Sequence, residues 1–422
     1  MPTFDPLPPM PAPGVATAEQ TQAIERRLIE EWQYPALLLM ERASLAIARF
    51  LEQTYPNAPV VVMAGSGNNA ADGLGVARLL ADRGHVVRVL TVGSAQGELA
   101  TRQMSWLGRR GVQVKVFGGS EQLGPEWVCL DALFGIGLNR PIKSDMQIAM
   151  DWVNKRHWRA VVSVDVPSGM RADSGENMGG LVRADETIAL GVLKPGLLMD
   201  PALRAVGRLW LADIGFPRQL IEPLPGRLNA PFPLPATAPD AHKGSLGSVL
   251  ILAGSRSMSG AAILAARAAC RSGVGLVYVA TGESQRDIVA AAVPEAIVVP
   301  LEESEGAIGP EGLAAMAAYF PRVRAIAMGP GLGRADRTLA LVDRVLGTFK
   351  GPIVLDADAL PRQGEAVASR TEPLVLTPHA GEMGRMFGVS AEEAQTRRIE
   401  LATRAAQAYK AVTVFKGARS LL

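Results

Sequence analysis

Short runs of consecutive apolar residues recur along the whole chain and alternate with stretches of helical periodicity. An uninterrupted apolar run is typical of a strand in a parallel sheet, because helices cover both faces of such a sheet. The runs predict strands in the first half at residues 59–64, 86–92, 112–117, 127–131, 160–166, 186–191 and 207–212, and in the second half at residues 247–253, 275–280, 296–300, 324–328, 352–356, 373–377 and 411–415. Strands that alternate with helices in this way indicate an α/β fold with parallel sheets.

A proline-rich segment separates the two series of strands. Seven of the 30 prolines fall within residues 216–240. Proline lacks a backbone donor and stiffens the chain toward an extended conformation, so such a segment connects compact units better than it packs inside one. We therefore predict a first domain over residues 1–220, a linker over residues 221–239 and a second domain over residues 240–422.

Composition and charge favour a protein that handles small molecules. With 48% hydrophobic residues in 422, the chain can bury sizeable cores. Its 43 basic and 41 acidic residues nearly balance, and no basic run stands out as a nucleic-acid or membrane patch. The sequence shows neither a signal peptide nor a run long enough to span a bilayer, so we expect a cytoplasmic protein. We also expect a homo-oligomer. The two cysteines, Cys129 and Cys270, fit no disulfide framework or metal site and are expected in the cores.

The most informative segment follows the first predicted strand, where Gly65 and Gly67 lead into a helix. Glycines let backbone N–H groups approach a ligand closely, and a helix N-terminus favours a phosphate. The spacing also fits a loose dinucleotide fingerprint, but the next predicted strand, at residues 86–92, ends without the acidic residue that holds a ribose in a dehydrogenase.

The polar side chains of this turn, Asn68, Asn69 and Asp72, are better candidates for ligand binding. Their alternative role is an Asx turn with a helix N-cap. Two further strand ends carry Asp131 and Asp165, each of which could also cap the helix that follows. Because the carboxyl ends of parallel strands meet at one edge of a sheet, we expect these two carboxylates to lie close together.

Four segments of the first half occur in a characteristic order: LLMERAS at residues 38–44, GSGNNAADG at 65–73, DALFGIGL at 131–138 and DVPSGMRADSG at 165–175. Together they resemble the YjeF N-terminal family, the NAD(P)H-hydrate epimerases, over about residues 17–215. The resemblance implies a Rossmann-like parallel-sheet domain. The sequence departs from the family at Ala70 and Ala71, where two glycines are usual, and we expect the added methyl groups to narrow the loop.

The resemblance implies a substrate site and a metal site. Hydrated NADH or NADPH would contact Asn68, Asn69, Asp72, Gly135, Ile136, Gly137, Leu138, Asn139, Arg140, Pro141 and Asp165. A potassium ion would be held by Asn69, Asp131 and Ser168. These are oxygen donors that suit a hard cation, and the lack of clustered Cys or His argues against zinc.

A carboxylate also suits the chemistry. In hydrated NADH the hydroxyl group and the ring nitrogen share one carbon, so the nitrogen lone pair can expel water once an acid protonates the hydroxyl. Re-addition of water to the other face of the ring inverts that carbon. One Asp can act first as the acid and then as the base, and we assign this role to Asp165.

The second half carries HKG at residues 242–244, GSRSMSGA at 254–261, GPGLG at 329–333, LDADAL at 355–360, LTPHAGEM at 376–383 and VFKGAR at 414–419. These segments resemble the ribokinase-fold ADP/ATP-dependent NAD(P)H-hydrate dehydratases over residues 242–420. The resemblance implies that Ala262, Gly331 and His379 contact the hydrated nucleotide, and that ADP phosphates contact Lys416, Gly417, Ala418, Arg419 and Ser420. Taken alone, the alanines after Gly260 could serve close helix packing, and His379 could cap a helix.

The dehydratase family continues beyond the Lys416 loop to a Gly-x-Gly-Asp segment that supplies phosphate-facing amides and an acid–base Asp. This sequence ends at Leu422, and we expect no dehydration without that segment.

We predict a bifunctional nicotinamide-nucleotide repair enzyme, in which a Rossmann-like domain interconverts the R and S hydrates of NADH or NADPH and a ribokinase-like domain is of the ADP-dependent S-hydrate dehydratase type. The alternatives are a small-molecule kinase on the second fold and a non-catalytic nucleotide-binding protein. The LTPHAGEM segment and the N-terminal fusion favour the dehydratase.

Overall fold

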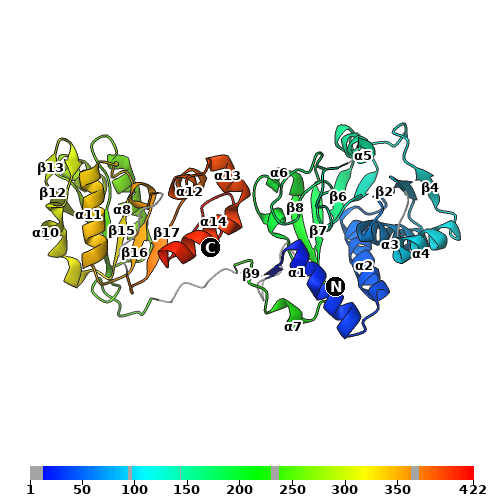
Figure 1. Ribbon diagram of the computed structural model, residues 1–422, viewed down its shortest axis with the longest axis horizontal. Helices are drawn as coiled ribbons and strands as arrows, with labels where there is room; N and C mark the ends of the chain where they lie inside the picture. The colour runs from blue at the N-terminus through cyan, green and yellow to red at the C-terminus, as the bar shows by residue number, and fades with distance from the viewer. Residues whose placement is uncertain (1–12, 94–96, 143, 230–236, 363–369) are drawn as a thin grey trace. The chain divides into compact units, whose positions relative to one another are not determined.

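Two seven-stranded parallel sheets form the framework of the protein, one in each of two compact units. The computed structural model describes residues 13–93, 97–142, 144–229, 237–362 and 370–422. The units comprise Met1–Phe232 and Pro233–Leu422, and Figure 1 colours them along the chain. The predicted α/β class is confirmed. Within the described ranges, no helix is both long and apolar enough to cross a membrane.

All seven strands of the first sheet follow the predicted apolar runs. They are β2 (Val60–Ala64), β3 (Val87–Thr91), β4 (Gln113–Val116), β5 (Val128–Ala132), β6 (Ala160–Val164), β7 (Glu186–Leu190) and β8 (Arg208–Ala212). Their order in the sheet is β4-β3-β2-β5-β6-β7-β8, and every pair is parallel. The chain reverses direction across the sheet between β2 and β5. In parallel α/β sheets this switch point opens a crevice at the carboxyl ends of the strands.

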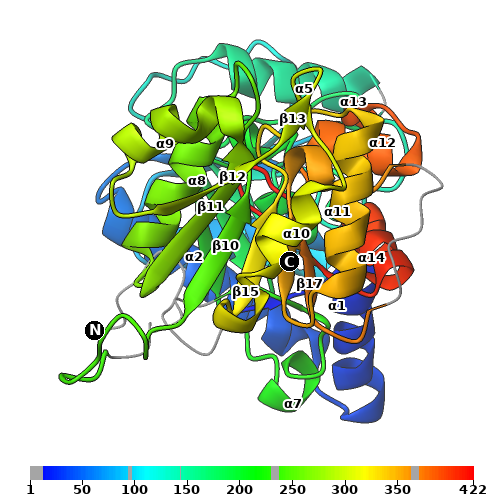
Figure 2. The ribbon, with the colours of Figure 1, turned by 90° about the vertical axis from the view of Figure 1, so that its left-hand side faces the viewer.

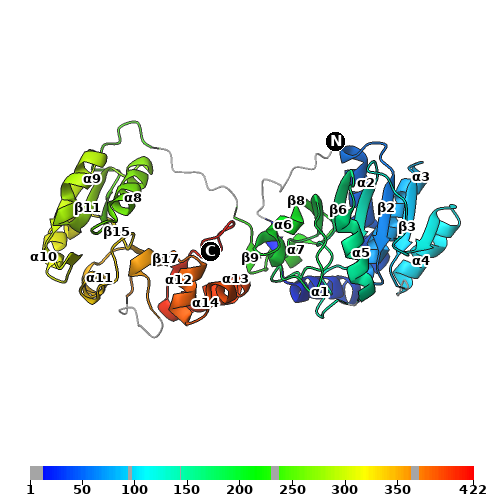
Figure 3. The same cartoon turned by 90° about the horizontal axis from the view of Figure 1, so that it is seen from above.

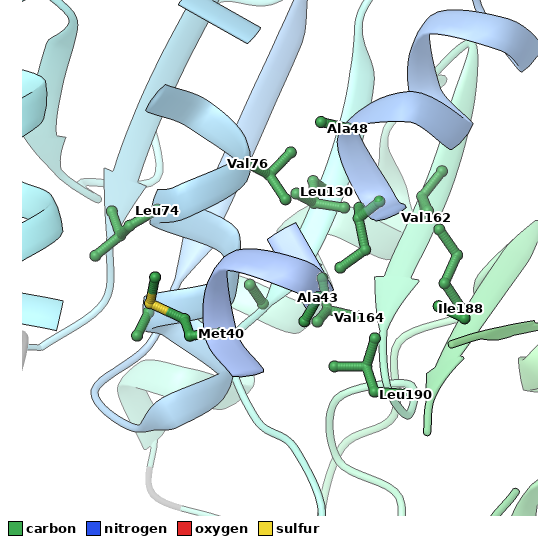
Figure 4. Close-up of a cluster of buried hydrophobic side chains, with 14 of the residues drawn as sticks. Met40, Ala43, Ala48, Leu74, Val76, Leu130, Val162, Val164, Ile188 and Leu190 are labelled. Carbon is green, nitrogen blue, oxygen red and sulfur yellow. The ribbon is translucent and has the colours of Figure 1, made fainter. Parts of the chain in front are cut away.

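Helices cover both faces of this first sheet. They are α1 (Ala18–Arg26), α2 (Ala36–Thr54), α3 (Asn68–Asp82), α4 (Glu98–Gly108), α5 (Ser144–Lys155), α6 (Leu203–Val206) and α7 (Arg218–Ile221), with a π-helical turn at Arg27–Glu31 and a 3₁₀ turn at Pro195–Leu198. The helices α3 and α4 lie beside β2 and β3 in two views (Figures 1 and 3). Figure 4 shows α2 side chains such as Met40 and Ala43 in one cluster with Leu130, Val162 and Ile188 of the strands. A second cluster on the other face packs α5 against the strands through Met150 and Val153.

Small residues let α3 sit close to its neighbours. A Cβ at Gly75 would lie 2.2 Å from Oγ of Ser44 in α2, and a Cβ at Gly73 would lie 2.6 Å from Cβ of Ala132 in β5. Ala70 and Ala71 also lie on this helix and are buried in its core. The expectation that their methyl groups narrow the loop is therefore wrong, because the methyl groups fill the interface between helix and sheet instead.

The second sheet has the strands β10 (Ser248–Leu252), β11 (Leu276–Gly282), β12 (Ile297–Leu301), β15 (Ala325–Met328), β16 (Ile353–Leu355), β17 (Leu374–Leu376) and β18 (Val412–Thr413). Their order is β12-β11-β10-β15-β16-β17-β18, all parallel. A small hairpin joins β13 (Glu303–Ser304) to β14 (Ala307–Ile308). All seven sheet strands overlap the predicted runs.

The helices of the second unit are α8 (Ser259–Arg271), α9 (Arg286–Ala292), α10 (Gly312–Ala317), α11 (Asp336–Thr348), α12 (Ala380–Phe387), α13 (Ala391–Thr396) and α14 (Arg398–Tyr409), with 3₁₀ turns at Glu283–Gln285, Phe320–Arg322 and Ala357–Ala359. Figure 2 shows α8 and α9 on one side of the sheet and α11 and α14 on the other. One core contains Ala262, Ala266 and Val289 from the α8–α9 side. The other contains Leu341 of α11 and Leu401 of α14.

Part of the proline-rich segment is folded rather than extended. Residues of β9 (Gly226–Arg227) pair antiparallel with β1 (Gly14–Val15), and Leu220 of α7 is buried in the first core. The prediction of a linker from residue 221 is therefore wrong for this stretch, because the segment around α7 and β9 packs on the first unit. The middle of the predicted linker, residues 230–236, lies outside the described residues. Of the two free cysteines, Cys129 is buried as expected, whereas Cys270 is half-buried.

Candidate functional site

A cavity of about 380 Å³ lies in the first unit, at the switch point between β2 and β5. Its lining comes from five parts of the fold: α1 to α2, the turn after β2 with the start of α3, helix α4, the loop after β5 and the ends of the strands beyond β5. In that order, these parts contribute Thr21, Gln22, Glu25, Ile29, Ala36, Leu39, Met40 and Ala43; Ser66, Gly67, Asn68, Asn69 and Asp72; Leu99; Leu133 to Arg140; and Asp165, Leu190, Lys194 and Ile214.

The structure brings most of the predicted substrate residues around this one cavity. Asn68, Asn69, Asp72, Asp165 and the run Gly135, Ile136, Gly137, Leu138, Asn139 and Arg140 all line it. Pro141 is exposed and is not among the lining residues. Asp131 and Ser168 are fully buried and likewise do not line the cavity.

Asp165 is held rigidly at the end of β6. Its backbone has φ of 66°, which is uncommon for a residue other than glycine, and its N–H donates to the carbonyl oxygen of Ile188 over 2.8 Å. The Oδ1 atom accepts from the backbone N–H of Leu190 over 2.9 Å and from Nζ of Lys194. No described residue donates to the other oxygen, Oδ2. One oxygen of the carboxylate is thus fixed, and the other is left for a ligand in the cavity.

Lys194 is not among the residues that the sequence predicts for the site. Its side chain is fully buried, and Nζ donates to the carbonyl oxygen of Leu190 over 3.0 Å as well as to Asp165. Buried lysines are rare unless they are paired. A sequence signal does exist, because Lys194 is the only charged residue in the apolar run at residues 188–199.

Two further carboxyl groups, those of Asp72 and Glu25, line the same cavity as the Asp165–Lys194 pair. Burial raises the pKa of Asp72 well above its usual value, with smaller contributions from Asp165 and Glu25. Burial and then the negative charge of Asp165 raise the pKa of Glu25, while Lys194 opposes the shift. The cavity thus holds one ammonium group and three carboxyl groups. Because the ammonium can neutralise only one carboxylate, this arrangement favours a proton on one of the other carboxyl groups.

The three predicted metal ligands gather behind the loop after β5. Ser168 Oγ donates to Oδ1 of Asp131 over 2.5 Å, and the Ser168 N–H donates to Oδ2 over 2.9 Å. Asn69 Nδ2 donates to the carbonyl oxygen of Phe134 over 2.9 Å, and Ser168 Oγ lies 3.3 Å from that same oxygen. A carboxylate, a hydroxyl, an amide and a carbonyl thus meet in one place.

The charge of this cluster fits a cation. Burial raises the pKa of Asp131, although hydrogen bonds from Ser168 and Ser163 oppose the shift. Among the residues that the structure describes, no Lys, Arg or His forms an ion pair with Asp131. A cation would supply the missing positive charge, and one carboxylate among neutral oxygen donors suits a hard ion of low charge.

The two glycines of the turn after β2 differ in role, and only Gly65 departs from the expectation that they let a ligand approach the backbone. A Cβ at Gly65 would lie 2.0 Å from the carbonyl oxygen of Leu133, so this glycine permits contact between two loops rather than approach of a ligand. Gly67 has open space around it and occupies the N-cap position of α3. The alternative of an Asn or Asp side chain as N-cap is therefore wrong for this turn.

In the second unit, Lys416 lies among acidic side chains at the ends of β16 and β17. Its Nζ donates to Oδ1 of Asp356 over 2.6 Å and lies 3.7 Å from Oε2 of Glu382. Thr377 Oγ1 donates to the same Asp356 oxygen over 2.8 Å. Asp356 and Glu382 belong to the segments LDADAL and LTPHAGEM and are not among the residues predicted for a site. The following residues Gly417, Ala418, Arg419 and Ser420 are exposed.

His379 is the N-cap of α12. Its Nδ1 accepts from the N–H groups of Gly381 and Glu382 over 3.0 and 3.2 Å, and the Glu382 carboxylate accepts from the His379 N–H. The capping role that the sequence left open is therefore present. The side chain is 54% exposed, and its Nε2 lies 3.3 Å from Oε1 of Glu382.

Ala262 and Gly331 come together around the turn after β10. Ala262 is fully buried, and its methyl group would lie 2.9 Å from a Cβ at Gly254. Gly331 has φ of 64°, and its carbonyl oxygen accepts from Oγ of Ser255 over 2.8 Å. These contacts show close packing of two strand-end loops, while substrate contact by Ala262 and Gly331 stays a prediction.

Comparison with known proteins agrees with this division of the chain. A family model described as YjeF-related protein N-terminus matches residues 36–196, and one described as NAD(P)H-hydrate dehydratase matches residues 249–422. The bifunctional NAD(P)H-hydrate repair enzyme Nnr of Thermofilum pendens is 35% identical over 97% of this chain and 80% of its own length. The protein of the same name from Gloeobacter violaceus is 37% identical over 96% of this chain and 81% of its own length.

A solved structure is similar to the second half alone. The ADP/ATP-dependent NAD(P)H-hydrate dehydratase from Bacillus subtilis, co-crystallized with ATP and Mg²⁺, is 36% identical over 44% of this chain and 64% of its own, with a TM-score of 0.36. Both resemblances noted in the sequence are confirmed by the family models. Since the relatives match nearly the whole chain at more than 30% identity, the chain belongs to the family of bifunctional NAD(P)H-hydrate repair enzymes.

Proposed function

We propose that the first unit interconverts the R and S hydrates of NADH or NADPH. The observation that carries this proposal is the hydrogen bonding of the Asp165 carboxylate. Its Oδ1 accepts from Lys194 and Leu190, while Oδ2 is free for a ligand in the cavity. A fixed carboxylate with one free oxygen suits proton exchange with a hydroxyl group of a bound substrate. The names of the relatives favour this repair chemistry over a small-molecule kinase or a binding protein.

The reaction uses the chain's own groups in a simple order. An acid in the cavity protonates the ring hydroxyl, the C–O bond breaks, and the ring nitrogen lone pair forms a double bond to that carbon. Water then adds to the other face, and a base takes the proton. Asp165 exchanges these protons through Oδ2, while Asn68, Asn69, Asp72 and the loop Gly135 to Arg140 hold the nucleotide.

A potassium ion fits the cluster of Asn69, Asp131 and Ser168, because its oxygens include a buried carboxylate without a cationic partner among the described side chains. When bound, it would neutralise Asp131 and fix the loop after β5, which forms one wall of the cavity.

For the second unit, the proposed function is binding of ADP or ATP in support of dehydration of the S hydrate. Lys416 is the group that would meet a phosphate, since its side chain is 40% exposed and lies on a loop at the carboxyl end of the sheet. Calorimetric titration of the chain with ADP should show binding that Lys416→Ala weakens. Titration with adenosine should show little dependence on Lys416, and equal loss for both ligands would contradict a phosphate contact.

The epimerase is tested by adding one pure epimer of hydrated NADH to the full chain and following the other by chiral chromatography. Asp165→Asn keeps the size of the side chain but cannot carry the proton, and it should slow epimerisation roughly a hundredfold. A near-normal rate in Asp165→Asn would remove Asp165 from the mechanism. Failure of the parent chain to shift the ratio above the uncatalysed rate would overturn the proposed function.

A further inference from the structure

Epimerisation requires proton exchange on both faces of the nicotinamide ring. The hydroxyl group leaves from one face as water, and water returns on the other face. A carboxylate fixed at one wall of a cavity reaches both faces only if the ring turns over between the two steps. A second proton-carrying group at another wall would remove that requirement.

Glu25 is placed to be such a group. It lines the same cavity as Asp165 but comes from helix α1, whereas Asp165 comes from the end of strand β6. Neither the family match at residues 36–196 nor the residues predicted from the sequence include it. The two carboxyl groups therefore approach the cavity from different elements of the fold.

Helix α1 is anchored firmly enough to position a side chain. Its N-cap, Thr17, forms a reciprocal capping box with Gln20, and the Ala18 N–H donates to Oδ1 of Asp173 over 2.7 Å. Ile24, next to Glu25 in the chain, and Leu28 are buried in the first hydrophobic core. The cap at the start of α1 and the buried residues Ile24 and Leu28 thus fix the helix that places Glu25 at the cavity.

The Glu25 carboxyl group is also free to interact with a ligand. Among the described residues, none donates a hydrogen bond to it or forms an ion pair with it. The titratable groups that face it are Asp72, Asp165 and Lys194, and Lys194 is engaged with Asp165. Burial and the charge of Asp165 raise the pKa of Glu25. Glu25 thus holds a proton more readily than a glutamate in water, while Asp165 has an ammonium partner.

Resting on the proposed epimerase function, we infer that Glu25 is a second catalytic acid–base group, which exchanges a proton on the ring face turned toward α1 while Asp165 acts on the opposite face. In one direction the Glu25 carboxylic acid protonates the departing hydroxyl, and the C–O bond breaks as the ring nitrogen supplies its electron pair. Water then attacks the other face, the new C–O bond forms, and Oδ2 of Asp165 accepts the proton. The reverse direction exchanges the two roles. For a second turnover in the same direction, Asp165 releases its proton to solvent and Glu25 takes one up, so atoms and charges balance over the cycle.

The test compares Glu25→Gln with Glu19→Gln in the full chain. Glu19 lies on the same helix but is exposed and is not among the residues that line the cavity, so it controls for loss of a charge on α1. Single epimers of hydrated NADH are supplied, and kcat and KM are measured above the uncatalysed background from pH 5 to 9. Glutamine has the size of glutamate but no acidic proton, and thermal unfolding checks that the variant is folded.

We expect Glu25→Gln to lower kcat about a hundredfold with little change in KM, because an amide can hold the substrate but cannot transfer the proton. The parent chain and Glu19→Gln should lose rate at high pH as Glu25 loses its proton, and this loss should be absent from Glu25→Gln. Glu25→Asp, which keeps the acid on a shorter side chain, should recover part of the rate.

Two results would overturn the inference while leaving the epimerase in place. The first is a kcat of Glu25→Gln equal to that of Glu19→Gln, and the second is an effect confined to KM, which would make Glu25 a binding residue only. An inactive parent chain would instead overturn the proposed function and the inference together.

Discussion

Lys194 and Asp165 form a buried ion pair on the wall of the cavity, with the lysine fully enclosed and the aspartate side chain 10% exposed. The pair joins the ends of β6 and β7, because Lys194 also donates to the carbonyl oxygen of Leu190, and the Leu190 N–H donates to Asp165. In a buried ion pair, each charge offsets the desolvation cost of the other. Removal of either partner is therefore expected to lower the free energy of unfolding.

Lys194→Met should destabilise the first unit by about 3–5 kcal/mol, because it leaves a buried carboxylate without its partner. The double variant Lys194→Met with Asp165→Asn removes both charges and should regain most of that loss. Urea unfolding of the two single variants, the double variant and the parent measures the coupling. A double variant no more stable than Lys194→Met would show that the lysine acts through packing rather than through charge.

Potassium should raise the melting temperature of the first unit more than sodium at equal ionic strength. A ligand bound only by the folded state stabilises it by about 2.7 kcal/mol at a concentration a hundredfold above Kd. Asp131→Asn removes the charge but keeps the size and should abolish the difference between the two ions. Equal melting temperatures of the parent chain in potassium and sodium would count against the site.

The framework could be predicted from sequence because parallel strands are buried on both faces. Their continuous apolar runs mark the strands directly, and the polar residues that follow them, such as Asn69, Asp131 and Asp165, mark the edge where the cavity lies. The local sequence pattern is a less reliable guide to a residue's role where one residue type can serve two purposes. Gly65 was read as an opening for a ligand, whereas its missing side chain makes room for the Leu133 carbonyl.

Glu25 could not be predicted because its role depends on contacts distant in the chain, whereas Lys194 had a sequence signal as the only charged residue in the apolar run at residues 188–199. Glu25 lies 140 residues before Asp165 and reaches the site only because α1 packs on the first core. Proline content likewise misplaced the start of the linker, since pairing of β9 with β1 joins residues more than 200 positions apart.

The carboxyl group of Asp72 should make the first unit less stable as pH rises. Its pKa in the folded protein lies well above the usual value of 3.8, mainly because of burial. Between these two pKa values the folded state holds a proton that the unfolded chain has lost, so the free energy of unfolding falls as pH increases through that range. Below pH 3.8 both states are protonated, and the penalty disappears.

Asp72→Asn should therefore be more stable than the parent at pH 7 and show little difference at pH 3.8 or below. Asp145→Asn is a suitable control, because Asp145 is an exposed acid on α5 outside the cavity lining. Melting temperatures of both variants across this pH range measure the slope. A stability gain for Asp72→Asn that is independent of pH would contradict a titrating carboxyl group at this position.

Gly65→Ala and Gly67→Ala should differ sharply although they lie two residues apart in one turn. A Cβ at Gly65 would lie 2.0 Å from the carbonyl oxygen of Leu133, a backbone atom that can move only if the end of β5 moves with it. A Cβ at Gly67 meets nothing within 4 Å, and its φ of −101° is accessible to alanine. We expect Gly65→Ala to cost roughly 1–3 kcal/mol, which lowers the melting temperature by about 2–4 °C per kcal/mol. Gly67→Ala should cost less, about 0.5 kcal/mol, because alanine is a poorer N-cap than glycine. Because the displaced strand end carries Asp131 and leads into the loop Gly135 to Arg140, Gly65→Ala should also lower epimerase activity at temperatures where it remains folded. Calorimetry and the chiral assay on the two variants measure both effects, and equal stability of the two would show that the turn can shift to admit a side chain.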